Sequence, residues 1–287
     1  MQIQTLADIF ACPACGSRVH AESHGLVCDA CGHLNRVSGN NVLCEAGAVQ
    51  SEDWLRQQTE SIDRYSDDSY EEDRTIATLF GNFIAVSLDR TLPLLDVGCG
   101  LFPDEPSYVA DLALTSYIGM EPIPTIVERD YLCLVGAVAE AIPVRDGTLG
   151  AAIFSTSLDH IETVQEAIAD VCRALAPDGR LYFWNGMHDP HLLAEAKSFG
   201  NIVNRSHGWR KLARIVGAPL EYAALYRRMA KNRRWLAEGR PLDHAHVRYF
   251  TTDTIGPAMA SYGLEIVRQI LVPGSNAHFI EARPKSR

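Results

Sequence analysis

Short apolar runs alternate with segments of helical spacing through the middle of the chain. The runs lie at residues 93–98, 117–121, 131–137, 149–157 and 179–185. Between the last two runs the apolar positions follow a helical period, and Pro177 and Gly179 stop that helix. Apolar strands separated by helices predict a parallel sheet that is covered on both faces. The predicted fold class is therefore α/β.

The segments on either side of this alternation complete the predicted organisation. Residues 75–88 carry apolar positions at helical spacing, residues 251–263 form a helix that Gly263 ends, and two closing strands follow. The closing strands are expected at 264–273 and 276–283. The predicted units are a small N-terminal unit over 1–45, an acidic linker or helix over 46–75, and a large domain over 76–287 with a helical insertion at about 186–245.

Composition narrows the class of protein further. The chain has 287 residues, of which 47% are hydrophobic and 22% charged, as expected for a globular protein with one large domain. We find no apolar run long enough to cross a membrane, and no basic segment leading into an apolar one at the start. A cytoplasmic protein with reduced thiols is expected. The formal net charge of −10 argues against a surface that coats nucleic acid.

Four of the eight cysteines form two copies of the pattern Cys-x-x-Cys-Gly near the N-terminus. They are Cys12, Cys15, Cys28 and Cys31. Zinc prefers four ligands in a tetrahedron, and each Cys-x-x-Cys turn supplies two thiolates. Two such turns can face each other across a short hairpin, which predicts a zinc ribbon with a closed, structural Zn²⁺ site. The alternatives are a redox disulfide pair and simple buried thiols.

A glycine turn follows the first strand of the predicted sheet. The stretch LLDVGCGLFPDE places Asp96 before Gly98 and Gly100. A dinucleotide site needs a third glycine at position 103, where the chain has Pro103, so a nicotinamide or flavin cofactor is disfavoured. Glu121 ends the second strand, where a carboxylate can accept hydrogen bonds from both ribose hydroxyls of a nucleoside.

After Glu121 comes GAVAEAIPVRDGTLGAAIFSTSLDHI, and with these motifs residues 75–287 resemble the class I S-adenosylmethionine-dependent methyltransferases. The resemblance implies a Rossmann-like, seven-stranded sheet and S-adenosyl-L-methionine as the cofactor. The residues that it assigns to the cofactor are Asp96, Gly98 and Gly100 for the methionine part, Glu121 for the ribose, Ala139 and Glu140 for the adenine, and Phe154 and Ser155 for the wall beside the amino acid. The chain departs from the family pattern at Phe102, Val138 and Gly150.

Methyl transfer requires alignment of the acceptor with the methyl group, and a base only where the acceptor carries a proton. Base candidates are expected at the ends of strands. Asp159 and His160 follow the fourth strand, and His246 lies just before the last helix. His160 is the best placed of the three, because a neutral imidazole can take a hydroxyl proton near pH 7.

The acceptor is less constrained by the sequence than the cofactor. Residues 203–240 hold ten Arg or Lys and two Glu, whereas residues 51–73 hold nine acidic residues and two Arg. These faces are either solvated or paired with each other, or the basic one caps the site and binds an anionic acceptor. A small-molecule acceptor, such as a sugar, a nucleotide sugar or a secondary metabolite, is favoured. The alternatives are an RNA methyltransferase with a zinc ribbon and a non-catalytic binding module.

Overall fold

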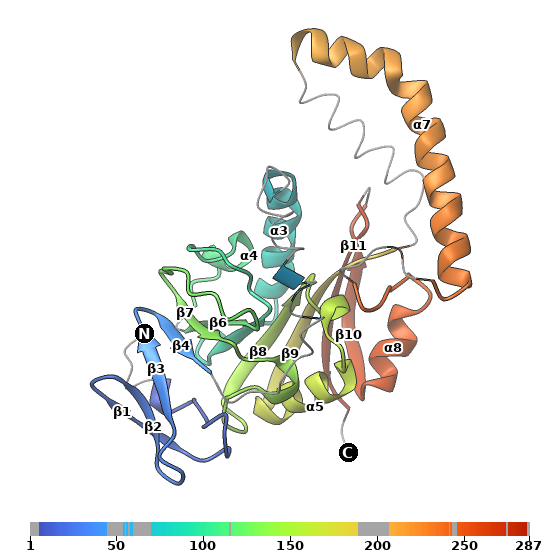
Figure 1. Ribbon diagram of the computed structural model, residues 1–287. Helices are drawn as coiled ribbons and strands as arrows, with labels where there is room; N and C mark the ends of the chain where they lie inside the picture. The colour runs from blue at the N-terminus through green and yellow to red at the C-terminus, as the bar shows by residue number, and fades with distance from the viewer. Residues whose placement is uncertain are drawn as a thin grey trace.

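The computed structural model describes residues 6–44, 70–114, 116–188, 207–240, 246–273 and 275–285, together with residues 54, 56, 58, 59 and 242. Figure 1 shows a central sheet with helices on both faces and a small all-β unit at the N-terminal end. The strands of the main domain are β5 (Leu94–Val97), β6 (Tyr117–Glu121), β7 (Leu132–Val135), β8 (Leu149–Ser155), β9 (Leu175–Gly186), β10 (Leu264–Leu271) and β11 (Ala277–Pro284).

These strands correspond to the seven-stranded sheet that is expected from the sequence, and they form one part of a sheet of 11 strands among the described residues. Their order is β7-β6-β5-β8-β9-β11-β10. The first five run parallel to one another, and β11 runs antiparallel to both β9 and β10. The order reverses direction between β5 and β8, and open α/β sheets bind their ligands at such a switch point.

Helices cover both faces of this sheet, as predicted. They are α3 (Tyr70–Ala85), α4 (Ser107–Ala110), α5 (Val164–Ala174) and α8 (Ile255–Ser261), with single 3₁₀ turns η1 (Ala139–Ala141) and η2 (Leu158–His160). Helices α3 and α4 pack with Leu94 and Ile153, whereas α5 and α8 pack with Leu95 and Phe154 on the other face. This division follows from the strand geometry, because successive side chains of a strand point to opposite faces.

Helix α5 ends earlier than its proline predicts. The helix stops at Ala174, and Leu175 is already extended with a ψ of 137°. The residue before a proline is disfavoured in the helical conformation, so the chain leaves the helix ahead of Pro177 and enters β9. The buried positions Val164, Ile168 and Val171 follow the helical period that the sequence shows.

The N-terminal unit continues the main sheet instead of standing apart from it. Its strands are β1 (Val19–Glu22), β2 (Gly25–Cys28), β3 (Leu34–Ser38) and β4 (Asn41–Leu43), each antiparallel to the next. Strand β4 then pairs in parallel with β7, through Asn41 with Cys133 and Leu43 with Val135. The sequence pattern predicts one short hairpin in this unit, but it carries no signal for the pairing of β4 with β7.

Helix α7 (Gly208–Ala237) makes up most of the described part of the predicted helical insertion. It projects away from the sheet (Figure 1), and most of its side chains are exposed, including Trp209 at 75% and Leu220 at 78%. None of the described helices is long and apolar enough to cross a membrane.

Candidate functional site

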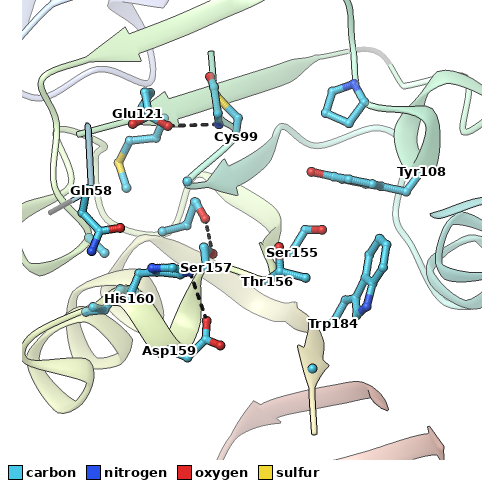
Figure 2. Close-up of a pocket in the computed structure, with 18 of the residues that line it drawn as sticks. Gln58, Cys99, Tyr108, Glu121, Ser155, Thr156, Ser157, Asp159, His160 and Trp184 are labelled. Carbon is cyan, nitrogen blue, oxygen red and sulfur yellow. Dashed lines mark hydrogen bonds and ion pairs between the residues drawn. The ribbon is translucent and has the colours of Figure 1, made fainter. Parts of the chain in front are cut away.

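A cavity of about 670 Å³ lies at the carboxyl ends of the parallel strands. Residues from the ends of β5, β6, β8 and β9 line it, as do Ser275, Asn276 and Ala277 at the start of the antiparallel β11. Its volume is within the range of roughly 300–1,000 Å³ that is typical of small-molecule sites. Figure 2 shows Glu121 and Gln58 at one side of the cavity and Tyr108 and Trp184 at the other.

The glycine turn after β5 forms part of the cavity wall. Gly98 and Gly100 both have left-handed backbone conformations, with φ of +80° and +78°. A Cβ on Gly98 would come within 2.8 Å of the Cβ of Ser157, whose hydroxyl donates a hydrogen bond to the carbonyl of Val97. Glycine is required at position 98 both by the conformation and by the close approach of Ser157.

Glu121 lines the cavity at the end of β6. One carboxylate oxygen accepts a hydrogen bond from the backbone N–H of Gly100 at 3.0 Å, and the other accepts one from Ile123 at 3.1 Å. The side chain is buried, and this burial raises the pKa of Glu121 to about 7, although the two N–H donors oppose the shift. Each oxygen retains a second lone pair that can accept a hydrogen bond from a ligand hydroxyl.

Asp96 is fully buried behind the glycine turn, and its side chain does not line the cavity. Its Oδ2 accepts hydrogen bonds from the hydroxyls of Tyr108 at 2.6 Å and Tyr117 at 2.7 Å. Burial raises the pKa of Asp96 to about 6, although the hydrogen bonds from the two hydroxyls partly oppose this shift. Because Tyr108 does line the cavity, Asp96 contributes to the site by fixing the position of that ring.

Three of the four remaining cofactor candidates line the cavity. Ala139 and Glu140 lie in η1, where Oε1 of Glu140 accepts hydrogen bonds from the backbone N–H and the hydroxyl of Thr163. Ser155 ends β8 and also faces the cavity. Phe154 differs from the expected arrangement, because its ring is fully buried on the opposite face of β8 and stacks on Phe183 with 5.1 Å between the ring centroids.

The three predicted acid–base residues meet at one end of the same cavity. Asp159 and His160 lie in η2, directly after β8, and His246 comes from a segment 86 positions later in the chain. The Nε2 atom of His160 lies 3.8 Å from Oδ1 of Asp159, and that of His246 lies 3.5 Å from Oδ2. The two imidazole rings are 4.7 Å apart between centroids. We call these three residues the acceptor cluster. His244, the nearest alternative in sequence, lies outside the described residues.

Several cavity residues were not selected from the sequence. The clearest are Trp54, Gln58, Tyr108, Trp184 and His188. The indole N–H of Trp54 donates a hydrogen bond to the carbonyl of His160 at 2.8 Å, although Trp54 comes from the predicted acidic linker. Trp184 lies two residues before the end of β9, so the strand-end rule that selects His160 could have selected it too. No such rule points to Trp54, whose contact joins positions 106 residues apart.

Helix α7, the described helix of the basic insertion, does not form the cap that was one interpretation of this segment. No described residue of α7 lines the cavity, and the exposed side chains of α7 include Arg210, Arg214 and Arg233. The expectation that the basic segment pairs with the acidic residues 51–73 falls largely outside the described residues.

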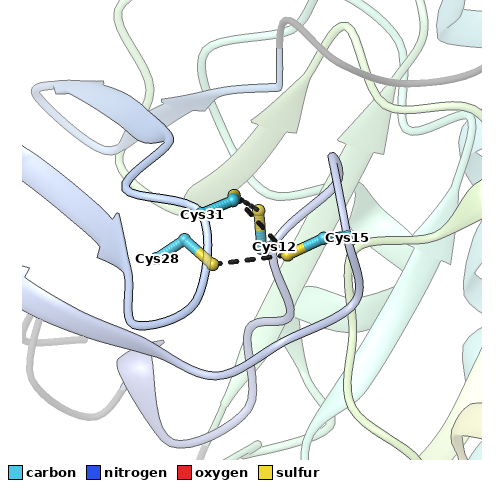
Figure 3. A group of neighbouring side chains, drawn as sticks. All are labelled: Cys12, Cys15, Cys28 and Cys31. Atoms are coloured by element: carbon cyan, nitrogen blue, oxygen red, sulfur yellow. Dashed lines mark hydrogen bonds between the residues drawn. The ribbon is translucent and has the colours of Figure 1, made fainter.

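The four predicted zinc ligands converge in the N-terminal unit (Figure 3). The sulfur atoms of Cys12 and Cys31 are 3.8 Å apart, those of Cys15 and Cys28 3.4 Å, and those of Cys15 and Cys31 3.5 Å. Zn–S bonds of about 2.3 Å place the sulfurs of a tetrahedral site about 3.8 Å apart. No disulfide joins any of the eight cysteines, all of which are described. The donor set and its spacing therefore fit a tetrahedral metal ion.

Comparison with known proteins identifies the enzyme class. A family model described as a methyltransferase domain matches residues 69–269. The chain belongs to the methyltransferase domain family. This match confirms the resemblance to class I S-adenosylmethionine-dependent methyltransferases, and it covers every cavity residue selected from the sequence. No curated protein matches the chain.

Two solved structures illustrate the likeness. One is the Burkholderia thailandensis 1,6-didemethyltoxoflavin-N1-methyltransferase with bound 1,6-didemethyltoxoflavin and S-adenosylhomocysteine, at 13% identity, 82% coverage of this chain, 86% of that chain and a TM-score of 0.48. The other is a Thermotoga maritima S-adenosylmethionine-dependent methyltransferase, at 15% identity and a TM-score of 0.46. The match covers 81% of this chain and 100% of that chain.

Proposed function

We propose that this methyltransferase methylates a small molecule, whose reacting atom lies at the acceptor cluster. The observation that carries the proposal is a single cavity that joins the glycine turn and Glu121 to Asp159, His160 and His246. A nucleoside cofactor bound at Glu121 and an acceptor at the cluster would share this space. The aromatic rings of Trp54, Tyr108 and Trp184 in the cavity wall suit a small, partly apolar acceptor.

On this proposal the residues around the glycine turn hold the cofactor. Glu121 accepts hydrogen bonds from the ribose hydroxyls. Ala139 and Glu140 of η1 form the wall beside the adenine, and the turn at Gly98 and Gly100 lies next to the methionine part. The cofactor supplies an activated methyl group on a sulfonium. The chain mainly has to align the acceptor with that group, an effect worth up to about 7–11 kcal/mol in favourable cases.

The acceptor cluster is proposed to take up the proton that the acceptor loses. His160 is proposed to lie next to the reacting atom, with Asp159 and His246 beside it. Its position is fixed on both sides, since the indole of Trp54 donates to its carbonyl and the N–H of His160 donates to the carbonyl of Ser157 at 3.1 Å.

The test combines cofactor binding with a transfer assay. Calorimetry should show binding of S-adenosylhomocysteine and none of NAD. Transfer of labelled methyl groups should then be measured on sugars, nucleotide sugars and phenols, with total RNA in parallel. Failure to bind S-adenosylhomocysteine would refute the assignment of the cavity, and label on RNA alone would refute the small-molecule acceptor.

The basic helix α7 is the observation that favours RNA as an alternative substrate. Several basic side chains of α7, among them Arg210, Arg233 and Arg234, are exposed and could contact phosphates outside the cavity. An RNA substrate predicts tight, saturable binding that weakens steeply with salt, and reversal of charge at Arg233 and Arg234 should abolish it. The small-molecule proposal predicts no such binding.

For the N-terminal unit we propose one structural Zn²⁺ held by Cys12, Cys15, Cys28 and Cys31. Four protein ligands leave no open position for a substrate. None of the four sulfurs lines the cavity, so this ion would stabilise the fold without entering the reaction.

A further inference from the structure

We propose that Asp159, His160 and His246 bind a divalent metal ion at the acceptor end of the cavity. One potential ligand atom from each residue lies within 4.8 Å of the other two. The binding of the ion stands on this geometry alone, whereas its role in catalysis rests on the proposed function.

The distances within the cluster suit ligands around an ion better than direct hydrogen bonds. The separations of 3.5 Å and 3.8 Å between the imidazole nitrogens and the carboxylate of Asp159 exceed the range of about 2.7–3.2 Å for a hydrogen bond. Metal bonds of about 2.0–2.2 Å place neighbouring ligand atoms roughly 3.0–3.5 Å apart. The two separations from Asp159 lie within a few tenths of an ångström of this spacing, and no two of the three ligand atoms are more than 4.8 Å apart.

Asp159 supplies the second, independent observation. Its side chain is 7% exposed, and no donor among the described residues hydrogen bonds to its buried Oδ1. A buried carboxylate oxygen without a partner costs free energy. A cation between the carboxylate and the imidazoles would supply that missing partner.

The backbone holds the three ligands in place before any ion binds. The N–H groups of Val247 and Arg248 donate to the carbonyl of Asp159 at 2.9 and 3.2 Å. The guanidinium of Arg248 donates to the carbonyls of Ile161 and Glu162 at 3.0 and 2.8 Å. The segment that carries His246 is thereby fixed to η2, so binding an ion would require little ordering of the chain.

The donor set limits the kind of ion. Two imidazoles and one carboxylate suit Zn²⁺, Fe²⁺, Co²⁺ or Ni²⁺ better than Mg²⁺ or Ca²⁺, which prefer oxygen ligands. Three protein ligands also leave open positions, unlike the four-cysteine site. The three residues line the cavity, so a ligand inside the cavity can reach those positions.

The acceptor class that fits such an ion bears a hydroxyl group. When the hydroxyl oxygen binds the ion, its pKa falls and its proton passes to bulk water, as the pKa of water falls to about 7 on a zinc ion. The oxygen then forms a bond to the methyl carbon while the carbon–sulfur bond breaks, and that electron pair stays on sulfur. When the ion is bound, the lowered pKa of the acceptor hydroxyl makes a general base unnecessary, and His160 acts as a ligand of the ion.

The binding test is a titration of the full-length, zinc-loaded protein with Co²⁺, followed by visible absorption. We expect one equivalent to bind, with the spectrum of nitrogen and oxygen ligation and no thiolate-to-cobalt charge-transfer band. Asp159→Asn and His246→Ala should each weaken the apparent affinity by about 10-fold or more. His24→Ala, an exposed histidine of the N-terminal unit, is the matched control and should leave the affinity unchanged.

The affinity for S-adenosylhomocysteine reports whether each variant is folded, and His160→Gln replaces any variant that is not. Failure of Co²⁺ to saturate, a spectrum with thiolate bands only, or equal affinity in wild type and variants would overturn the site. Binding of Co²⁺ without methyl transfer to any small molecule would instead refute the proposed function and leave the site intact. Turnover of a hydroxyl acceptor that does not respond to the ion would overturn the activating role.

Discussion

The carboxylate of Glu121 makes the affinity for the cofactor depend on pH near neutrality. Its burial raises its pKa to about 7, so the folded protein without ligand holds a mixture of neutral and ionised Glu121 at physiological pH. The ribose hydroxyls donate hydrogen bonds, and an ionised carboxylate accepts them on both oxygens, whereas a neutral carboxyl group carries a proton on one oxygen. Binding of the ribose therefore favours the ionised form of Glu121. The affinity for S-adenosylhomocysteine should thus rise as the pH rises through 7.

The magnitude follows from the fraction of ionised carboxylate. With a pKa of about 7, roughly one tenth is ionised at a pH of about 6 and roughly nine tenths at about 8. The dissociation constant should therefore fall about 10-fold between these values, which corresponds to about 1.4 kcal/mol. Glu121→Gln removes both the charge and this titration. At the higher pH it should weaken the complex by about 1.5–3 kcal/mol, the usual scale for hydrogen bonds to a charged group.

Isothermal titration calorimetry with S-adenosylhomocysteine at both pH values measures these effects. Glu140→Gln is the matched control, because Glu140 also lines the cavity but is assigned to the adenine and not to the ribose. That variant should keep the pH dependence of the wild type, whereas Glu121→Gln should lose it. Equal pH dependence in wild type and Glu121→Gln would show that another group, such as a cavity histidine, titrates instead and would refute the reasoning.

Three further changes test the remaining assignments. Gly98→Ala should weaken S-adenosylhomocysteine binding by at least about 10-fold, because φ of +80° and the contact with Ser157 both oppose a Cβ, whereas Gly147→Ala, with φ of +69° and open space, should not. Elemental analysis should find about one zinc ion per chain in the four-cysteine site, and Cys28→Ser should lower the melting temperature without weakening cofactor binding in the folded fraction; zinc near zero would contradict the ribbon. His160→Ala should lower turnover by about 10²–10⁴-fold with an unchanged affinity for S-adenosylhomocysteine, and a small loss would place the acceptor elsewhere.

The parts of the fold that rest on local periodicity could be predicted from the sequence. The alternation of apolar runs gives strands β5 to β9, and the helical period of residues 163–174 gives α5 with its buried face. The glycine turn could be predicted as well, since a left-handed backbone leaves glycine at positions 98 and 100. Asp159 and His160 follow from the rule that ligands meet the carboxyl ends of parallel strands.

The parts that depend on contacts between distant positions could not be predicted in the same way. The burial of Phe154 away from the cavity is set by the phase of side chains along β8, where a shift of one residue exchanges the two faces. The place of Trp54 beside His160 depends on a contact across 106 positions. Helix α7 was predicted as a helix from local pattern, but its projection away from the cavity is a tertiary property.

The position of the N-terminal unit explains how the proposed zinc site, although outside the cavity, could affect the stability of the enzyme. Strand β4 covers the edge of β7, which would otherwise present unpaired backbone groups, and the N–H of Cys44 donates to the carbonyl of Val135 at 2.9 Å. One residue further, the N–H of Gly136 donates to the carbonyl of Glu121 at 2.8 Å. On its other side, the N–H of Ala11 donates to the carbonyl of Pro143 at 3.0 Å.

These contacts place the unit against both segments that flank η1, the proposed adenine wall. A unit of about 40 residues buries too little apolar surface to be stable alone, and Phe10, Leu26 and Val42 belong to the same core cluster as Leu95. A metal ion between the two cysteine turns would therefore supply stability to a shared core. Its loss should therefore lower the melting temperature of the methyltransferase domain as a whole, because the unit and the sheet share a core and backbone hydrogen bonds.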